Sequence, residues 1–312
     1  MADSPARSRF SLDQKGRDTM LAMGMVLPAI LYIALLLGVP IVLAAYYSLT
    51  DVTTGGSTVR FVGLGNFAAL LHDPDFLGAV GNTVIITVAT LIGTLILATI
   101  QAELLARRFR GKWIVRFLIL LPWTAPASLS VIAWLWMLDS TFSPYDWLLR
   151  HAGLLGHPGA LLGSFSNMYW LGRPGLALFS IILVNIWRLM PLATVIILAG
   201  LNGLPRDIYE QAQIDGAGYF RRLFQVVLPI LYPVFGVTIL FTFVFTFTDI
   251  VTVYILTRGG PANSTQVLTT LAFFTGVQGG SLGRGAAIAL FLLPVLAVVS
   301  IIILSLIRRR EI

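Results

Sequence analysis

The residues most able to do chemistry in this sequence are polar side chains inside long apolar runs. Thr238, Thr242, Thr246, Asp249 and Thr252 recur at steps of four, four, three and three in one such run. At about 100° per residue they would fall within roughly 120° of arc on a helix. Polar groups in hydrocarbon are costly and usually functional, so we expect this stripe to line a solvated pathway. The alternative is that each threonine hydrogen-bonds the backbone of its own helix.

A second polar pair, Asn185 and Arg188, lies in the preceding apolar run. A buried guanidinium must meet water, carbonyl groups or a carboxylate. Two compatible interpretations stay open: an ion pair between Arg188 and Asp249, or hydrogen bonds from the pair to a polar solute. The candidate substrate pathway therefore comprises Asn185, Arg188, Thr242, Thr246 and Asp249.

Enzyme chemistry has few candidates here. The sequence contains neither a Gly-x4-Gly-Lys-Ser/Thr phosphate loop nor a Gly-x-Ser-x-Gly elbow. His72, His151 and His157 lack His-Glu-x-x-His spacing, so no metal site is predicted. With no cysteine, thiolate nucleophiles and disulfides are excluded. We predict a chain that is not an enzyme and holds no cofactor of its own.

The longest mixed polar segment between two apolar runs is 201–229. Pro205 and Asp207 suit the first turn of a short helix. Gly216 and Gly218 permit the backbone reversal that ends it, and a second short helix follows. Small residues allow another protein to approach closely, so we expect a docking surface. The alternative is a short interfacial loop.

The elements that position these residues are membrane spans. Hydrophobic residues make up 57% of the 312-residue chain and charged residues 11%, against about 25% charged in a soluble domain. We predict an all-α polytopic protein with a tail at 1–19 and one transmembrane domain at 20–312. Six runs approach or exceed the roughly 20 residues that a span needs: about 22–48, 80–105, 114–138, 175–200, 230–256 and 286–307.

Basic residues set the expected orientation. With the N-terminus inside, segments 1–19, 106–116, 201–229 and 308–312 hold 15 of the 21 Lys and Arg residues. The outside segments hold five, which is the asymmetry of the positive-inside rule. Both termini and the segment 201–229 are therefore expected in the cytoplasm.

The segment 201–229 also carries a family resemblance. Glu210-x-Ala212-x3-Gly216-Ala217, followed by Val226 and Leu228-Pro229, resembles the EAA loop of ABC-importer permeases. Gln211 and Val226 depart from the usual Ala and Ile but keep similar size or character. The resemblance implies a coupling helix that seats in an ATPase subunit through these residues: Glu210, Ala212, Asp215, Gly216, Ala217, Leu228 and Pro229.

Two outer segments extend the resemblance to carbohydrate-type permeases of the maltose, glycerol-phosphate and oligosaccharide group. Phe61-Val-Gly-Leu-Gly-Asn66 is similar to their first outer loop. Tyr254-Ile-Leu-Thr-Arg-Gly-Gly-Pro261 is similar to their outer segment after the fifth span. Gly259, Gly260 and Pro261 are therefore expected to contact a solute-binding protein, within an outer surface formed by 139–174 and 258–283.

The resemblance implies a type I ABC importer permease fold in the bacterial cytoplasmic membrane. Its implied partners are a second homologous permease, two ATPase subunits that bind ATP and Mg, and an extracytoplasmic solute-binding protein. Alternating access would carry a carbohydrate or related polar solute. The alternative function is a secondary transporter driven by an ion gradient. The sequence does not choose among sugars, polyols and sugar phosphates.

Overall fold

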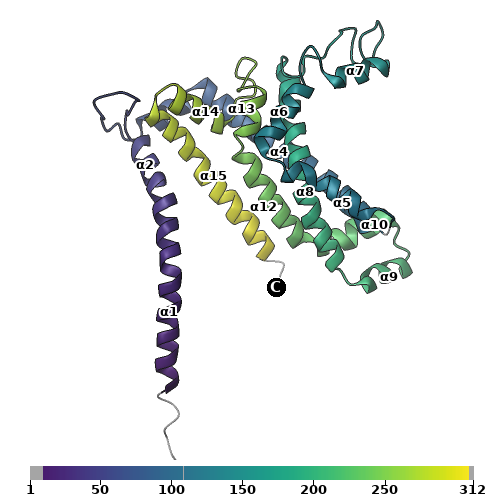
Figure 1. Ribbon diagram of the computed structural model, residues 1–312, viewed down its shortest axis with the longest axis horizontal. Coiled ribbons are helices and arrows are strands. Elements are labelled where there is room, and N and C mark those ends of the chain that lie inside the picture. Colours follow the sequence, from purple (N-terminus) through teal and green to yellow (C-terminus); the bar gives the residue numbers. More distant parts are fainter. Residues whose placement is uncertain (1–9, 108, 309–312) are drawn as a thin grey trace, which may run out of the picture.

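The computed structural model describes residues 10–107 and 109–308, and there the chain folds into helices joined by loops (Figure 1). A single antiparallel bridge joins Thr50 and Phe61 in the described part. The helical elements, including three π-helical turns labelled η, are α1 (Phe10–Ile33), η1 (Ala34–Gly38), α2 (Val39–Ser48), α3 (Gly65–Leu71), α4 (Pro74–Ala106), α5 (Lys112–Thr124), α6 (Ala127–Met137), α7 (Pro144–His151), α8 (Pro174–Gly203), α9 (Arg206–Ile214), α10 (Tyr219–Arg222), η2 (Leu223–Val227), α11 (Leu228–Ile230), α12 (Tyr232–Phe247), α13 (Val251–Leu256), α14 (Leu268–Phe273), η3 (Phe274–Gln278) and α15 (Leu282–Arg308).

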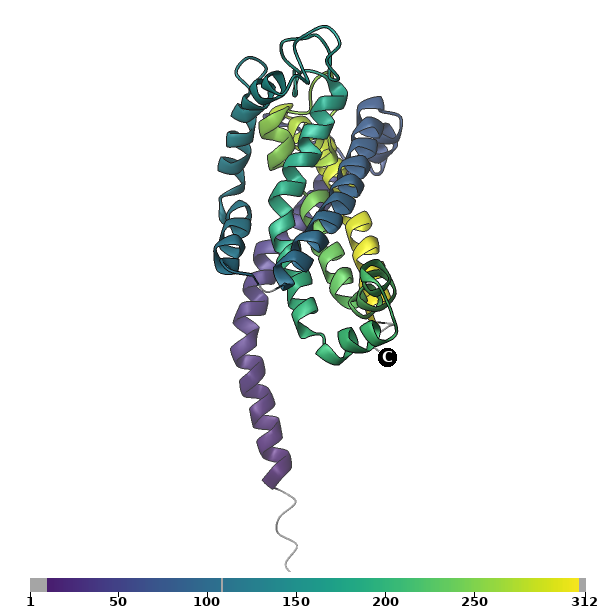
Figure 2. The same ribbon diagram turned by 90° about the vertical axis from the view of Figure 1, so that its right-hand side faces the viewer.

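Four helices in the described chain are long and apolar enough to cross a membrane, and the number rises to six if each of two bent pairs counts as one span. The first is formed by α1, η1 and α2, of which α1 extends away from the other helices (Figures 1 and 2). No residue in its most apolar 18-residue stretch is buried, and α2 packs against α15. The all-α architecture is confirmed, whereas the positions of the membrane surfaces along each helix stay predictions.

The centre of the helical body is the pair α4 and α8, against which α12 also packs. α4 begins where the Asp73 carboxylate accepts a hydrogen bond from the Asp75 N–H, with a proline in its first turn. The two long helices approach closely at Gly93, because a Cβ there would overlap the side chain of Ile186. Close backbone approach through small residues is a common means of joining helices in lipid.

Proline explains why two of the expected spans are not straight. α5 and α6 meet at 96°, and Ala125 before Pro126 is extended, as the residue preceding a proline prefers. The helical segment 219–230 and α12 meet at 76° around Leu231, between Pro229 and Pro233. A further break at 248–250 separates α12 from α13. The expected runs 114–138 and 230–256 are therefore each divided.

Candidate translocation pathway and coupling surface

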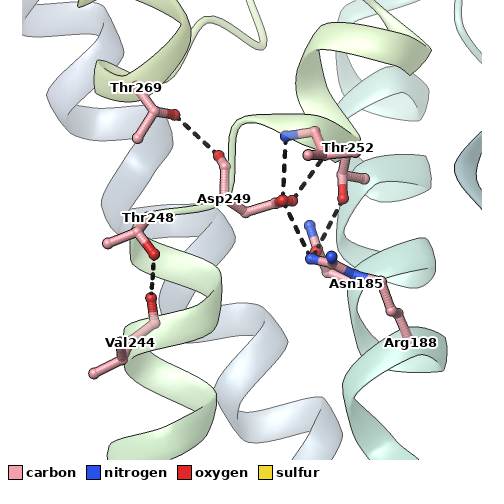
Figure 3. Close-up of polar contacts among 8 residues, drawn as sticks. Asn185, Arg188, Val244, Thr248, Asp249, Thr252 and Thr269 are labelled. Atoms are coloured by element: carbon pink, nitrogen blue, oxygen red, sulfur yellow. Dashed lines mark hydrogen bonds and ion pairs between the residues drawn. The ribbon is translucent and has the colours of Figure 1, made fainter. Parts of the chain in front are cut away.

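The break between α12 and α13 places a carboxylate opposite an arginine of α8 (Figure 3). Asp249 Oδ1 lies 3.2 Å from Arg188 Nη2, and the two side chains are 6% and 14% exposed. Arg188 Nη2 also donates to Asn185 Oδ1 at 3.1 Å, and the Thr252 hydroxyl donates to the same oxygen at 3.3 Å. The structure thus joins α8, α13 and the break in one polar cluster, which we call the Arg188–Asp249 cluster.

Asp249 holds this position because it caps the helix that follows it. Its carboxylate oxygens accept hydrogen bonds from the N–H groups of Val251 and Thr252 at 3.2 and 3.3 Å. The Thr269 hydroxyl of α14 donates to the Asp249 carbonyl oxygen at 2.9 Å. Asp249 therefore caps the start of α13 and forms an ion pair with Arg188.

Two donors of the Arg188–Asp249 cluster are left without a partner. Asn185 Nδ2 and Arg188 Nε are both buried and make no hydrogen bond to the residues that the structure describes. Unpaired buried donors are costly, so they favour a solute hydroxyl, a water or a second subunit as their partner. The arrangement leaves hydrogen-bond donors free to meet polar groups from outside the cluster. In the described residues no group of three or more His, Asp or Glu could hold a metal ion.

The predicted threonine stripe lies inside the bundle. Thr238, Thr242, Thr246 and Thr252 are each at most 5% exposed. Thr238 donates to the Val234 carbonyl oxygen of its own helix, which matches the alternative interpretation for that residue. The Thr246 hydroxyl has no partner, and a narrow cleft between α8 and α12 is lined by Thr238 and Thr242. Its other lining residues include Leu192, Ile196, Phe241 and Phe245.

A second buried threonine stripe lies on α4 and was not predicted from the sequence. Thr83, Thr87, Thr90 and Thr94 are at most 4% exposed, and their spacing of four, three and four was the available signal. The hydroxyls of Thr87, Thr90 and Thr94 are buried and have no hydrogen-bond partner in the described part of the chain. The polar interior therefore extends over α4 as well as α8 and α12.

The expected coupling residues lie at the end of the molecule opposite the outer loops (Figures 1 and 2). α9 carries Glu210 and Ala212, of which Ala212 is buried and Glu210 has a side chain outside the described residues. Ile214 is 84% exposed, and Asp215 beside it is also exposed. Ile214 and Asp215 are thus both accessible at this end of the molecule.

Gly216 makes the turn that follows α9. Its φ is +70°, and a Cβ there would meet no other atom within 4 Å, so the position is open as well as left-handed. The Ala217 N–H donates to the Ala212 carbonyl oxygen at 2.9 Å, which closes the turn. Leu228 and Pro229 form α11 beyond it and turn the chain into α12.

The chain that follows α9 and α10 packs against α4 and α8 through Val227 and Leu231. Val227 and Leu231 are buried in a cluster with Ala98 of α4 and Ile197 of α8. The Arg107 guanidinium lies 6.0 Å from the centre of the Tyr219 ring, within reach of a cation–π contact. A displacement of α9 and α10 would therefore be transmitted to α4 and α8.

The outer residues Gly259, Gly260 and Pro261 belong to a tightly held loop. Gly259 has φ +87°, and a Cβ there would overlap Gln266 Oε1, so only glycine fits. The Thr265 hydroxyl donates to the Gly260 carbonyl oxygen at 2.6 Å. The Asn82 amide of α4 donates to the Gln266 carbonyl oxygen at 3.0 Å. The loop is thus fixed to the N-terminal part of α4.

Long apolar helices around a buried polar cluster, with an exposed amphipathic helix at one end, define a polytopic membrane transport component. Residues 94–312 match the family described as the binding-protein-dependent transport system inner membrane component. The chain belongs to this family. It is therefore a multi-pass inner-membrane component of a transport system and not an enzyme.

Curated relatives align with most of the chain. The sulfoquinovosyl glycerol transport system permease SmoG of Agrobacterium fabrum is 30% identical over 94% of this chain and 92% of its own length. The trehalose/maltose permease MalF of Thermococcus litoralis is 30% identical over 88% and 90%. The sn-glycerol-3-phosphate permease UgpA of Salmonella typhi is 30% identical over 82% and 84%.

The fold is also similar to solved structures. A chain of a bacterial ABC transporter involved in the import of the acidic polysaccharide alginate superposes with a TM-score of 0.78 at 19% identity. The match covers 96% of this chain and 99% of that one. The same transporter bound to its alginate pentasaccharide-loaded periplasmic protein gives a TM-score of 0.77. The chain has the type I ABC importer permease fold, and no comparison supports an ion-gradient-driven secondary transporter.

Proposed function

We propose that this chain is one of two permease subunits in an ATP-driven importer for a neutral carbohydrate or a related hydroxyl-rich solute. The observation that carries the ATP-driven part is the exposed turn at Gly216 after α9. The polar helix α9 and the exposed Ile214 lie at the same end of the molecule as the basic segments 106–116 and 201–229. An ATPase subunit is the partner that the EAA-type sequence of this turn implies.

The hydroxyl-rich character of the proposed solute follows from the relatives, two of which carry anionic solutes, and its neutrality follows from the charge of the Arg188–Asp249 cluster alone. The named relatives carry sulfoquinovosyl glycerol, trehalose or maltose, and sn-glycerol-3-phosphate, all of them rich in hydroxyl groups. In this chain the guanidinium of Arg188 is already paired with a carboxylate. The cluster therefore offers an anion no free positive charge, which favours a neutral solute.

The proposed pathway is lined by Asn185, Arg188, Thr242, Thr246 and Asp249. In support, Asn185 Nδ2, Arg188 Nε and the Thr246 hydroxyl lack partners within the chain. A solute hydroxyl both donates and accepts, so it suits donors of this kind. The remaining wall of the pathway would come from the second permease.

Alternating access would then couple the two ends of the chain. ATP-driven closure of two ATPase subunits moves α9, and the buried contacts of Val227 and Leu231 pass this movement to α4 and α8. The helices open outward and receive solute from a binding protein docked on the loop at Gly259–Pro261. We propose that both termini and α9 face the cytoplasm, as the basic residues favour.

Replacement of Gly216 by tryptophan tests the docking. The variant should co-purify with little ATPase subunit and should lose uptake. The large side chain would block the close approach of the ATPase subunit and would strain the left-handed backbone at this position. Gly78→Trp is the matched control, since Gly78 is exposed on α4 near the opposite end with no atom within 4 Å of its Cβ position. Normal ATPase co-purification and normal uptake by Gly216→Trp would sink the proposal.

The solute class is tested separately on the partner binding protein. A thermal-shift screen against neutral sugars, polyols and sugar phosphates should show stabilisation by a neutral sugar or polyol. Stabilisation by sugar phosphates alone would refute the neutral class and leave the ATPase docking untouched.

A further inference from the structure

An apolar groove with an arginine in its wall lies where α4, α5 and α8 meet near the start of α5. Its volume is about 250 Å³. Leu105, Ile119, Leu120, Val195, Leu198 and Ala199 line it. Its lining residues Leu105 and Asn202 lie near the C-terminal ends of α4 and α8, the end of the molecule that carries α9 (Figure 1), and the residues that the transport proposal uses do not line it.

Arg116 also lines this groove and has no partner for its charge. Its Nε is buried without a hydrogen bond, and in the described residues no carboxylate pairs with it. A guanidinium beside apolar walls is stable only when an anion or water compensates it. The Arg116 guanidinium therefore needs a hydrogen-bond acceptor from outside the chain.

A second cation stands one helical turn away. Lys112 and Arg116 are four residues apart on α5, so they lie on the same helix face, about 6 Å apart along the axis. Neither is paired with a carboxylate in the described part of the chain. Lys112 begins α5 directly after Arg110 and Gly111, at the expected cytoplasmic surface. Two like charges on one face attract a multivalent anion such as a phosphate.

The surface of α5 and α8 beside the groove is apolar and exposed. Val195, which lines the groove, is 43% exposed, and Trp113 and Phe117 of α5 are 74% and 61% exposed. Apolar side chains this exposed on predicted spans face hydrocarbon, and a tryptophan at the helix start suits the membrane interface. The groove thus opens to acyl chains, while its basic end opens to headgroups.

We propose that this groove binds an anionic phospholipid of the inner leaflet, with Arg116 and Lys112 on its phosphate and an acyl chain along the apolar walls. Charge complementarity selects the headgroup, and the position of the groove at the inner end of the spans selects a lipid over a soluble anion. The site depends on membrane placement and is independent of which solute the chain transports.

Native mass spectrometry of the purified transporter complex tests this site. The complex is delipidated and titrated with phosphatidylglycerol or with zwitterionic phosphatidylcholine. Wild type should bind one phosphatidylglycerol in preference to phosphatidylcholine. Arg116→Gln should weaken this preference about tenfold, the scale of a lost charged hydrogen bond, and Lys112→Gln should weaken it less. Arg110→Gln is the matched control, since it removes an exposed charge that precedes α5, whereas Lys112 and Arg116 share a face of that helix.

A soluble headgroup, glycerophosphoglycerol, separates the lipid from a free phosphate. It should not displace phosphatidylglycerol at equal concentration, because it lacks the acyl chain. Equal weakening by Arg110→Gln would mean general attraction to a basic surface and would overturn the site. Unchanged binding by Arg116→Gln, or displacement by the headgroup alone, would overturn it as well.

Discussion

Removal of the negative charge at Asp249 isolates the contribution of its ion pair with Arg188. The paired atoms lie 3.2 Å apart, and both side chains are largely buried. Asp249→Asn keeps the shape of the side chain and, because asparagine caps helices well, keeps an acceptor for the first N–H groups of α13. Arg188 would retain Asn185 Oδ1 as an acceptor at 3.1 Å but lose its counter-charge.

The magnitude follows from this geometry. Loss of one partner from a buried ion pair costs about 3–5 kcal/mol of unfolding free energy. The remaining hydrogen bond and the 14% exposure of Arg188 place this pair at the lower end, about 3 kcal/mol. The double variant Arg188→Gln, Asp249→Asn carries no uncompensated charge, so it should be more stable than Asp249→Asn by about 1–2 kcal/mol.

The assay is unfolding of the purified chain by SDS in mixed micelles, followed through the loss of helical circular dichroism. Thr248→Val is a suitable control, because Thr248 lies beside Asp249 but its hydroxyl bonds only its own helix in the described structure. A double variant no more stable than Asp249→Asn would show that the charge of Arg188 does not depend on Asp249, and would refute the reasoning.

Three further predictions concern other parts of the chain. Both ring nitrogens of His157 face carbonyl oxygens, those of Pro158 and Gly153, and these hydrogen bonds raise the pKa of His157. The stabilisation they give is present below pH about 6.5 and is lost as pH rises through the raised pKa. Hydrogen exchange in 153–163, corrected for intrinsic rates, should therefore become faster with pH in wild type and not in His157→Gln. Gly285→Ala should cost about 1–3 kcal/mol in SDS unfolding, because its Cβ would overlap the Gly276 backbone, whereas Gly81→Ala in open space should cost nothing. Gly259→Val should abolish the stimulation of ATPase activity by loaded binding protein and leave subunit assembly intact; undiminished stimulation would remove this loop from the docking surface.

Much of the fold could be predicted from the sequence, because a bilayer requires long apolar helices and the hydropathy pattern locates them. The breaks at Pro126 and Leu231 were harder to place. A proline shows that a helix bends, but the angle depends on neighbouring helices that only the structure supplies. The break at 248–250 has no proline and is held by the capping carboxylate of Asp249.

The candidate site was predicted in part. A polar residue in hydrocarbon is a strong sequence signal, and Arg188 and Asp249, which the sequence left as one of two interpretations, do form a pair. The buried threonines of α4 were missed, since threonine is common in membrane helices and the spacing alone did not show which face was inside. Arg116 also could not be distinguished by sequence from the other basic residues near the membrane surface. Basic side chains that set membrane topology and basic side chains that bind lipid look alike in a sequence.

ATP-driven uptake by the reconstituted transporter tests the central claim most directly. The complete complex is placed in proteoliposomes with ATP inside and solute-loaded binding protein outside, and labelled solute is counted. We predict uptake that requires both ATP and the binding protein and that persists when an uncoupler removes ion gradients. Uptake that continues without ATP and collapses with the uncoupler would contradict the account.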